Sequence, residues 1–217
     1  MKISTLSRQS GVSVATIKFY LREQLLPPGT PTARNQAEYN QDHLTRLKLI
    51  RVFTGIGMMS LACVREVLTA IDDKGLTAQG LARVITRALL ADHTPEESEP
   101  DPRDSSQSRI DEFVDNVGWQ VEPDAPARST LAQVFTALQY LGWDGEAEVF
   151  ELYASTAESL ARREVVAAPP QESAAALVAR TVLYEVAFAA MRRMAYEHHL
   201  ALRAGNGPAP DPDEPAD

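Results

Sequence analysis

A short run of residues near the N-terminus carries side chains that suit contact with nucleic acid. Thr16, Lys18, Tyr20 and Arg22 lie within one expected helix, which runs from Val14 to about Gln24, and the helical period places them on its outward face. Hydroxyl and cationic groups there can reach phosphates and base edges in the DNA major groove, and amides at a helix N-terminus face phosphate. This pattern predicts a helix that reads DNA.

The elements around this run are those of a helix-turn-helix. A first helix over residues 3–10 precedes the turn Gly11-Val12-Ser13, in which Ser13 is placed to cap the second helix. Apolar side chains at helical spacing let the two helices share a small core; they are Leu6, Val12, Ile17 and Leu21. Polar, turn-prone residues over 32–40 then indicate a two-stranded wing, and further helices are expected at 42–53, after Ser60, and at 77–91.

The order of residues in this segment resembles the MerR family of bacterial regulators. The family writes its recognition helix as threonine, a branched aliphatic residue, a basic residue, two aromatics and, after a short stretch, Leu-Leu-Pro. The matching residues are Thr16, Ile17, Lys18, Phe19, Tyr20 and Leu25-Leu26-Pro27. The family wing carries an arginine and ends on a tyrosine before an acidic helix start, and Arg34, Tyr39 and Asp42 stand in those places. The resemblance covers about residues 1–72.

The resemblance implies a set of DNA-binding residues: Ser13, Thr16, Lys18, Phe19, Tyr20, Arg22, Arg34 and Tyr39. Each has a simpler interpretation beside it. Tyr20 and Tyr39 can be core aromatics, Thr16 can satisfy its own helix, and the cations can form a solvated face. The sequence departs from the family where Lys18 replaces an arginine, because lysine lacks the planar, bidentate fork of a guanidinium. It also has Ala37-Glu38 where a second wing arginine is usual.

Quaternary structure and mode of action are implied by the same resemblance. Such regulators are homodimers joined by a helix that follows the DNA-binding domain, and one apolar stripe fits that role: Leu81, Val84, Ile85, Ala88 and Leu89. The expected partners are double-stranded promoter DNA at a near-palindrome, a second copy of the chain and RNA polymerase at the promoter. A signal would make the dimer deform the DNA, at a cost on the order of 1–10 kcal/mol. Many relatives simply repress.

Charge and composition set the remaining limits. The 217-residue chain has a net charge of −9, but residues 1–71 hold nine basic and four acidic residues, a balance of +5 that leaves −14 for the remainder. A basic head on an acidic body confines the attraction for phosphate to one end. The single cysteine, Cys63, cannot form an internal disulfide or a cysteine-rich metal site. With no signal peptide and no expected membrane span, the chain is predicted to be cytoplasmic.

The expected fold class is all-α, with the small β wing as its only sheet. Residues 93–108 and 205–217 are rich in proline, acids and small residues, which is typical of linkers and tails. The predicted organisation is therefore a winged helix-turn-helix at 1–72, a dimerisation helix at 73–92, a linker at 93–108, a helical effector or oligomerisation domain at 109–204 and a disordered tail at 205–217.

Aromatic residues in the second domain raise the question of an effector. Trp119, Tyr140, Trp143 and Tyr153 can be core residues, or they can line an apolar pocket for a small molecule. The adjacent histidines of Glu197-His198-His199 diverge on a helix, so no metal site is expected. No cofactor site or catalytic residue set is expected either, and the chain is predicted not to be an enzyme. The alternative to a regulator is a protein-interaction adaptor whose DNA-binding head only localises it.

Overall fold

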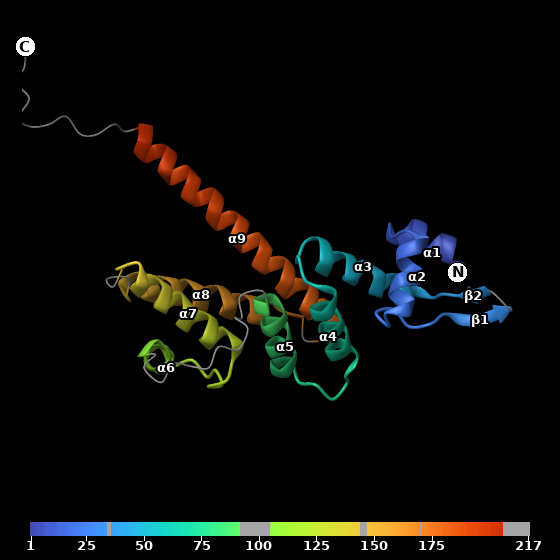
Figure 1. Cartoon of the computed structure of the whole chain (residues 1–217), viewed down its shortest axis with the longest axis horizontal. Coiled ribbons are helices and arrows are strands. Elements are labelled where there is room, and N and C mark those ends of the chain that lie inside the picture. Colours follow the sequence, from blue (N-terminus) through green and yellow to red (C-terminus); the bar gives the residue numbers. More distant parts are fainter. Residues whose placement is uncertain (34–35, 92–104, 144–146, 170, 206–217) are drawn as a thin grey trace, which may run out of the picture.

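The computed structural model describes residues 1–33, 36–91, 105–143, 147–169 and 171–205, and it shows helices with one two-stranded sheet (Figure 1). In chain order the elements are α1 (Ile3–Ser10), α2 (Val14–Arg22), β1 (Thr30–Ala33), β2 (Gln36–Glu38), α3 (Gln41–Gly55), α4 (Leu61–Asp72), α5 (Ala78–Leu90), α6 (Ser105–Val117), α7 (Pro126–Tyr140), α8 (Ala147–Ala167) and α9 (Ala174–Gly205). The predicted fold class, helical with a small β wing, is confirmed.

The N-terminal helices begin and end where local signals place them. Gly11 follows α1 in the left-handed conformation with φ of 68°, which glycine adopts at little cost. Ser13 caps α2 by accepting a hydrogen bond from the amide of Thr16 at 3.1 Å. Asn40 and His43 form a reciprocal capping box at the start of α3. The wing strands β1 and β2 pair antiparallel, with Thr30 opposite Glu38.

A first core fixes the helix-turn-helix and the wing to each other. Its buried members come from α1, α2, α3 and the segments between them: Leu6, Val12, Ile17, Leu26, Tyr39, Leu44 and Leu47. Three of them, Leu6, Ile17 and Leu47, are fully inaccessible. The three predicted core positions Leu6, Val12 and Ile17 are buried here, and Leu21 packs against them while half-exposed. Helix α2 therefore has a fixed orientation relative to the wing.

A second core joins segments far apart in the sequence. Phe53 of α3 and the apolar faces of α4 and α5 pack around Val178 and Val182 of α9, and all three of these named side chains are fully buried. Packing is close at Gly57, where an added Cβ would lie 2.8 Å from a Val182 methyl and 2.9 Å from the Phe53 carbonyl oxygen. The sequence assigned residues 174–182 to the second domain, but in the structure they pack with the first.

Helices α6 and α7 pack against each other around a smaller, third core of Ile110, Val114 and Ala132. Beside it, the buried Arg128 donates to a carboxylate oxygen of Asp111 at 2.8 Å and to the carbonyl oxygen of Val121 at 2.6 Å. Helix α7 ends in a Schellman motif, in which Gly142 has a φ of 75° and the amide of Trp143 donates to the carbonyl of Leu138. Helix α6 starts at Ser105, so residues 105–108 of the predicted linker are helical.

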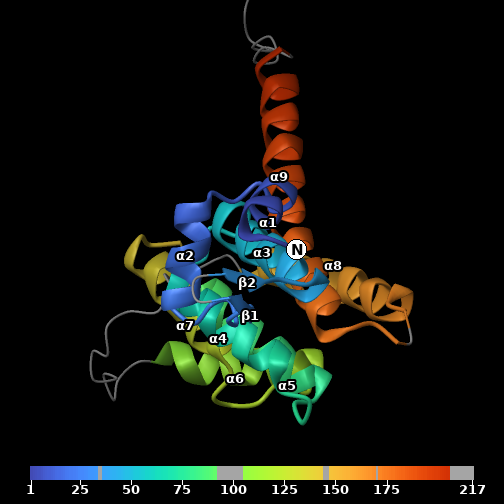
Figure 2. The ribbon, with the colours of Figure 1, turned by 90° about the vertical axis from the view of Figure 1, so that its right-hand side faces the viewer.

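The long helix α9 bears on the expectation that the chain has no membrane span. It extends away from the other helices in both views (Figures 1 and 2). By length and composition alone, residues 174–203 could cross a membrane, since an 18-residue stretch within them has a mean hydropathy of 1.5. Arg180 and Glu185 interrupt the apolar run of this stretch. Only 11% of the stretch is buried in the chain.

Candidate nucleic-acid interface

Helix α2 presents cations on one side and core residues on the other. Ile17 is fully buried beneath the helix, whereas Lys18 and Arg22 are exposed. The guanidinium of Arg22 lies 5.9 Å from the centre of the Phe19 ring, within the range of a cation–π contact. Among the residues that the structure describes, Lys18 and Arg22 form no ion pair. Their charges are therefore available to an anion.

The first turn of α2 is occupied by its own cap. The hydroxyl of Ser13 accepts from the amide of Thr16 and lies 2.7 Å from the Thr16 hydroxyl. Thr16 thus takes part in capping its own helix, which is the simpler interpretation given for it in the sequence analysis. Ser13 remains exposed and Thr16 half-buried, so both stay close to the surface that α2 offers.

The two tyrosines of the predicted set hold elements together through their rings. Tyr20 packs against both the first and the second core. Tyr39 is 8% exposed and meets His43 edge to face at 5.2 Å. The Tyr39 amide donates to the carbonyl oxygen of Met1 at 2.8 Å, and the amino group of Met1 donates to the carbonyl oxygen of Tyr39 at 2.5 Å. These contacts agree with the core interpretation of both rings and tie the wing to the N-terminus.

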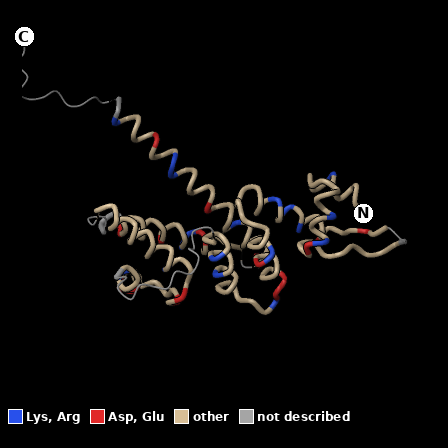
Figure 3. The backbone as a smooth tube through the Cα atoms, in the orientation of Figure 1, with Lys and Arg blue, Asp and Glu red and all other residues tan. Residues whose placement is uncertain are grey.

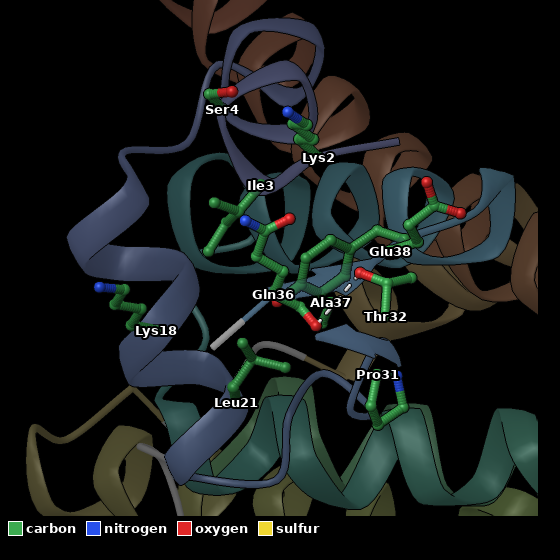
Figure 4. A pocket seen from close by; sticks show the side chains of 11 residues that line it. Lys2, Ile3, Ser4, Lys18, Leu21, Pro31, Thr32, Gln36, Ala37 and Glu38 are labelled. Atoms are coloured by element: carbon green, nitrogen blue, oxygen red, sulfur yellow. Dashed lines mark hydrogen bonds between the residues drawn. The ribbon is translucent and has the colours of Figure 1, made fainter. Parts of the chain in front are cut away.

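A hollow of about 690 Å³ lies between α2 and the wing (Figure 4). Lys18 of α2, Lys2 from the segment before α1, and Thr32 and Glu38 of the wing line it, together with Tyr39. Lys2 was missing from the predicted site, because a cation outside any helix has no periodic signal; its position next to the first helix was the available clue. Arg34, the predicted wing cation, lies outside the described residues.

Not every basic residue of the N-terminal segment is free for DNA. Basic positions follow one another along α1, α2 and α3 (Figure 3). Arg46, however, donates to the carbonyl of Leu25 at 2.6 Å and pairs with Asp72 at 2.7 Å. Arg65 pairs with Glu23 at 3.1 Å. These two arginines stabilise the N-terminal module, which comprises α1 to α4 and the wing. Among the described residues, the exposed cations without an ion pair in this module include Lys2, Arg8, Lys18, Arg22 and Lys48.

Comparison with known proteins identifies the same segment. The model of the MerR HTH family regulatory proteins matches residues 1–71. Residues 1–71 form a MerR-family HTH domain. A curated relative, the HTH-type transcriptional regulator ZntR homolog of Haemophilus influenzae, is 31% identical over 89 residues, which are 41% of this chain. The chain spans 65% of the length of that relative.

A solved structure extends the likeness beyond the MerR domain. The candidate transcriptional regulator SCO5550 of Streptomyces coelicolor A3(2) is 32% identical and superposes with a TM-score of 0.66. The match covers 94% of this chain and 98% of that one. The helical C-terminal region is thus shared with that candidate regulator. Residues 1–71 are thus a MerR-type DNA-binding domain, and the whole chain resembles a transcriptional regulator.

The apolar stripe of α5 that was predicted to form a dimer is largely buried within the single chain. Leu81, Ile85 and Ala88 are buried in the second core, at 4%, 1% and 5% exposure. Val84 and Leu89 are half-buried and pack against the same core. In the single chain, therefore, α4 and α9 cover most of the surface that the stripe would offer to a partner.

The four aromatics predicted for an effector pocket divide into two pairs. Trp119 and Tyr153 line a cavity of about 550 Å³ in the C-terminal region. Tyr140 and Trp143 lie outside its lining and are 90% and 57% exposed. Arg192 of α9 also lines the cavity, and its hydrogen bond to the Tyr153 hydroxyl raises the pKa of the guanidinium. Arg192 was missed because its helix is distant in the sequence from the other lining residues.

Proposed function

We propose that this chain binds a near-palindromic promoter site as a homodimer and responds to a signal through its C-terminal helical region. One observation carries the DNA-binding part of the proposal. Lys18 and Arg22 stand exposed and without an ion pair among the described residues, on a helix whose other face is anchored by the fully buried Ile17. A rigid helix with free cations loses little entropy on docking to DNA.

Different parts of the proposed surface contact the major groove and the sugar–phosphate backbone of the DNA. Helix α2 enters the major groove, where Lys18 provides a point charge to phosphate or to a guanine edge. Lys2 and the wing border the hollow beside α2 and accommodate the sugar–phosphate strand. Ser13, Thr16, Phe19, Tyr20, Arg34 and Tyr39 complete the proposed contact set, with the hydroxyls of the tyrosines as phosphate donors. Glu38 lines the same hollow and repels phosphate, so the DNA strand is expected to lie nearer to α2 than to Glu38.

The homodimer needs a surface, and α9 offers more of it than α5 does. The predicted α5 stripe is mostly covered within the chain, as described above. Along α9, by contrast, Tyr184, Phe188 and Met191 follow one another at the spacing of a coiled-coil seam and are 48%, 38% and 55% exposed. We therefore place the main contact between two α9 helices, with Val84 and Leu89 of α5 at its margin.

Sedimentation velocity distinguishes the two surfaces. Phe188→Glu together with Met191→Glu puts charges on the α9 seam and is expected to convert the dimer to monomer. Val84→Glu on α5, at the margin of the proposed contact, is the comparison variant and is expected to weaken the dimer less than the double substitution does. If the dimer persists in the double variant and dissociates in Val84→Glu, the main dimer contact lies on α5 and not on α9.

DNA binding is tested by fluorescence anisotropy with the DNA upstream of the chain's own gene. Lys18→Ala is expected to weaken binding about tenfold and to reduce the slope of affinity against salt by about one, because one phosphate or base contact is lost. Lys74→Ala is the control, since Lys74 is an exposed lysine in the turn between α4 and α5, outside the proposed surface. Equal losses for both lysines, or none for Lys18, would contradict the proposed surface.

The adaptor alternative is favoured by one feature, the apolar exposed length of α9. Truncating the chain before α9 does not test it, because Val178 and Val182 complete the second core. The surface substitutions on α9 are the better test. If Phe188→Glu with Met191→Glu abolishes capture of a different protein while dimerisation and operator binding persist, α9 binds a partner protein and is not the dimer contact, which favours the adaptor hypothesis.

A further inference from the structure

The cavity of about 550 Å³ in the C-terminal region has walls from four helices. Its larger lining side chains are apolar or aromatic: Phe113 of α6, Leu138 of α7, Phe150 and Tyr153 of α8, and Trp119 after α6. Its size lies within the roughly 300–1,000 Å³ of small-molecule sites, which are typically apolar with a few placed polar groups. The rings of Phe150 and Phe135 are in contact, with their centres 4.3 Å apart and their planes tilted by 32°, and this contact supports one wall of the cavity.

One charged residue, Arg192, reaches this cavity among the described residues that line it. The guanidinium donates to the Tyr153 hydroxyl at 2.6 Å and lies 5.4 Å from the centre of the same ring. Within the described part of the chain it forms no ion pair, and no carboxylate lines the cavity. A guanidinium has five donors in a planar fork, so most of its hydrogen-bonding capacity remains for another acceptor.

We propose that the cavity binds a small aromatic or aliphatic molecule that carries one anionic group, with the anion on Arg192 and the apolar part against Trp119 and Phe150. This rests on the proposed function in one respect: the ligand is the class of signal to which the regulator responds. Arginine pairs with carboxylates and sulfonates through paired N–H donors, which fixes orientation as well as charge. Lipophilic cations are disfavoured, because the cavity offers them a like charge and no carboxylate.

The position of Arg192 connects the cavity to the DNA-binding end. Its bond to Tyr153 joins α8 to α9, and the first turns of α9 are buried among α3, α4 and α5 through Val178 and Val182. An anion that takes the guanidinium donors competes with the Tyr153 hydroxyl. Ligand binding therefore acts on a contact that holds α9 against α8.

The test uses the full chain and two matched dyes. The anionic probe is 8-anilino-1-naphthalenesulfonate, and the neutral probe is N-phenyl-1-naphthylamine, which lacks the sulfonate. The anionic dye is expected to bind saturably, and Arg192→Gln is expected to weaken it about tenfold, the loss for one charge-assisted hydrogen bond. Arg193→Gln is the control, an exposed neighbour that does not line the cavity, and is expected to leave binding unchanged.

Two further measurements show whether the dye binds in this cavity. Arg192→Gln is expected to leave the neutral dye within about twofold, whereas Ala157→Phe, which fills the cavity from α8, is expected to weaken both dyes. In a Trp143→Phe background, energy transfer from Trp119 to the bound anionic dye is expected.

Three results would overturn the proposal: no saturable binding, equal binding by wild type and both cavity variants, or neutral dye binding that exceeds anionic dye binding. Dye binding is measured without DNA, so a failure of operator binding leaves these results interpretable. Conversely, if the anionic dye binds at Arg192 and operator affinity is unchanged by it, the ligand site stands and its role as the signal falls.

Discussion

The N-terminal module (α1 to α4 with the wing) and the C-terminal helices (α6 to α9) bury their large side chains to different degrees. In the module, Leu6, Ile17, Leu47 and Phe53 are fully inaccessible, and cations account for much of the exposed face of α2. In the C-terminal region Tyr140 is 90% exposed, Trp143 57% and Tyr153 45%. The module thus holds a rigid surface in place, whereas the C-terminal helices leave apolar surface open for a ligand or a second chain.

The difference follows from how each region is built. Caps, a left-handed glycine and short turns define α1, α2 and the wing from neighbouring residues. Helices α6 to α9 instead meet through contacts between residues far apart in sequence, such as Arg192 with Tyr153. A region held by few distant contacts has more freedom to respond to a ligand, since local stability is set by such contacts.

Removing one phenylalanine from each region should show the largest contrast. Phe53→Ala is expected to lower the free energy of unfolding by about 3–5 kcal/mol, because it empties a fully buried position of the second core. Phe113→Ala, at a half-buried position on the cavity wall, is expected to cost only about 1 kcal/mol. Urea denaturation followed by circular dichroism measures both. Equal costs would mean that the C-terminal region is packed as tightly as the module.

The ion pair between Arg128 of α7 and Asp111 of α6 tests the same comparison, since it is a partly buried polar contact in the more loosely packed region. Asp111→Asn leaves Arg128 buried without its counter-charge and is expected to cost about 1–3 kcal/mol, reduced from a fully buried pair because the Asp111 side chain is 44% exposed. Arg128→Met removes the cation and keeps an apolar stem, so its cost is expected to be smaller. Hydrogen exchange of α6 and α7 amides is the readout, and a larger cost for Arg128→Met would contradict this order.

Two serine caps compare the regions at the same chemistry. Ser13 caps α2 and Ser173 caps α9 through the amide of Ala176 at 3.2 Å. Each serine-to-alanine substitution is expected to cost about 1 kcal/mol in thermal unfolding. Only Ser13→Ala is expected also to weaken operator binding, because α2 is the proposed recognition helix. Ser13→Asp, which keeps an acceptor at the cap, serves as the stability control.

The sequence was sufficient for the parts that local chemistry determines. Ser13, Gly11 and the period of Leu6, Val12 and Ile17 predicted the helix-turn-helix, because capping and core spacing act between near neighbours. The same approach could not show that Val178 and Val182 enter the N-terminal core, since an alanine-rich helix has no unique apolar face. It grouped Trp119 and Tyr153 with Tyr140 and Trp143 by residue type, although only helix packing decides which aromatics share a cavity.

The smallest expected effect concerns pH at the start of α9, where the two regions join. Glu172 accepts two hydrogen bonds from Arg180, at 3.0 and 2.7 Å, and the hydrogen bond from the guanidinium lowers the pKa of this carboxyl below its ordinary value of 4.5, against the opposing effect of desolvation. The folded chain therefore favours the carboxylate. The stabilisation is fully present above pH 4.5 and is lost as the pH falls through the lower pKa of the folded state.

Glu172→Gln removes this titration while keeping a hydrogen-bond acceptor of similar shape. Thermal unfolding at pH 7 and below pH 4 is expected to show that the wild type loses its advantage over the variant in acid, by a small amount, since the pair lies near the surface. Glu185→Gln, on the exposed part of α9, is the matched control and is expected to show no such convergence. A wild-type advantage that persists unchanged in acid would mean that the pair does not stabilise the joint, and that α9 is held there by Val178 and Val182 alone.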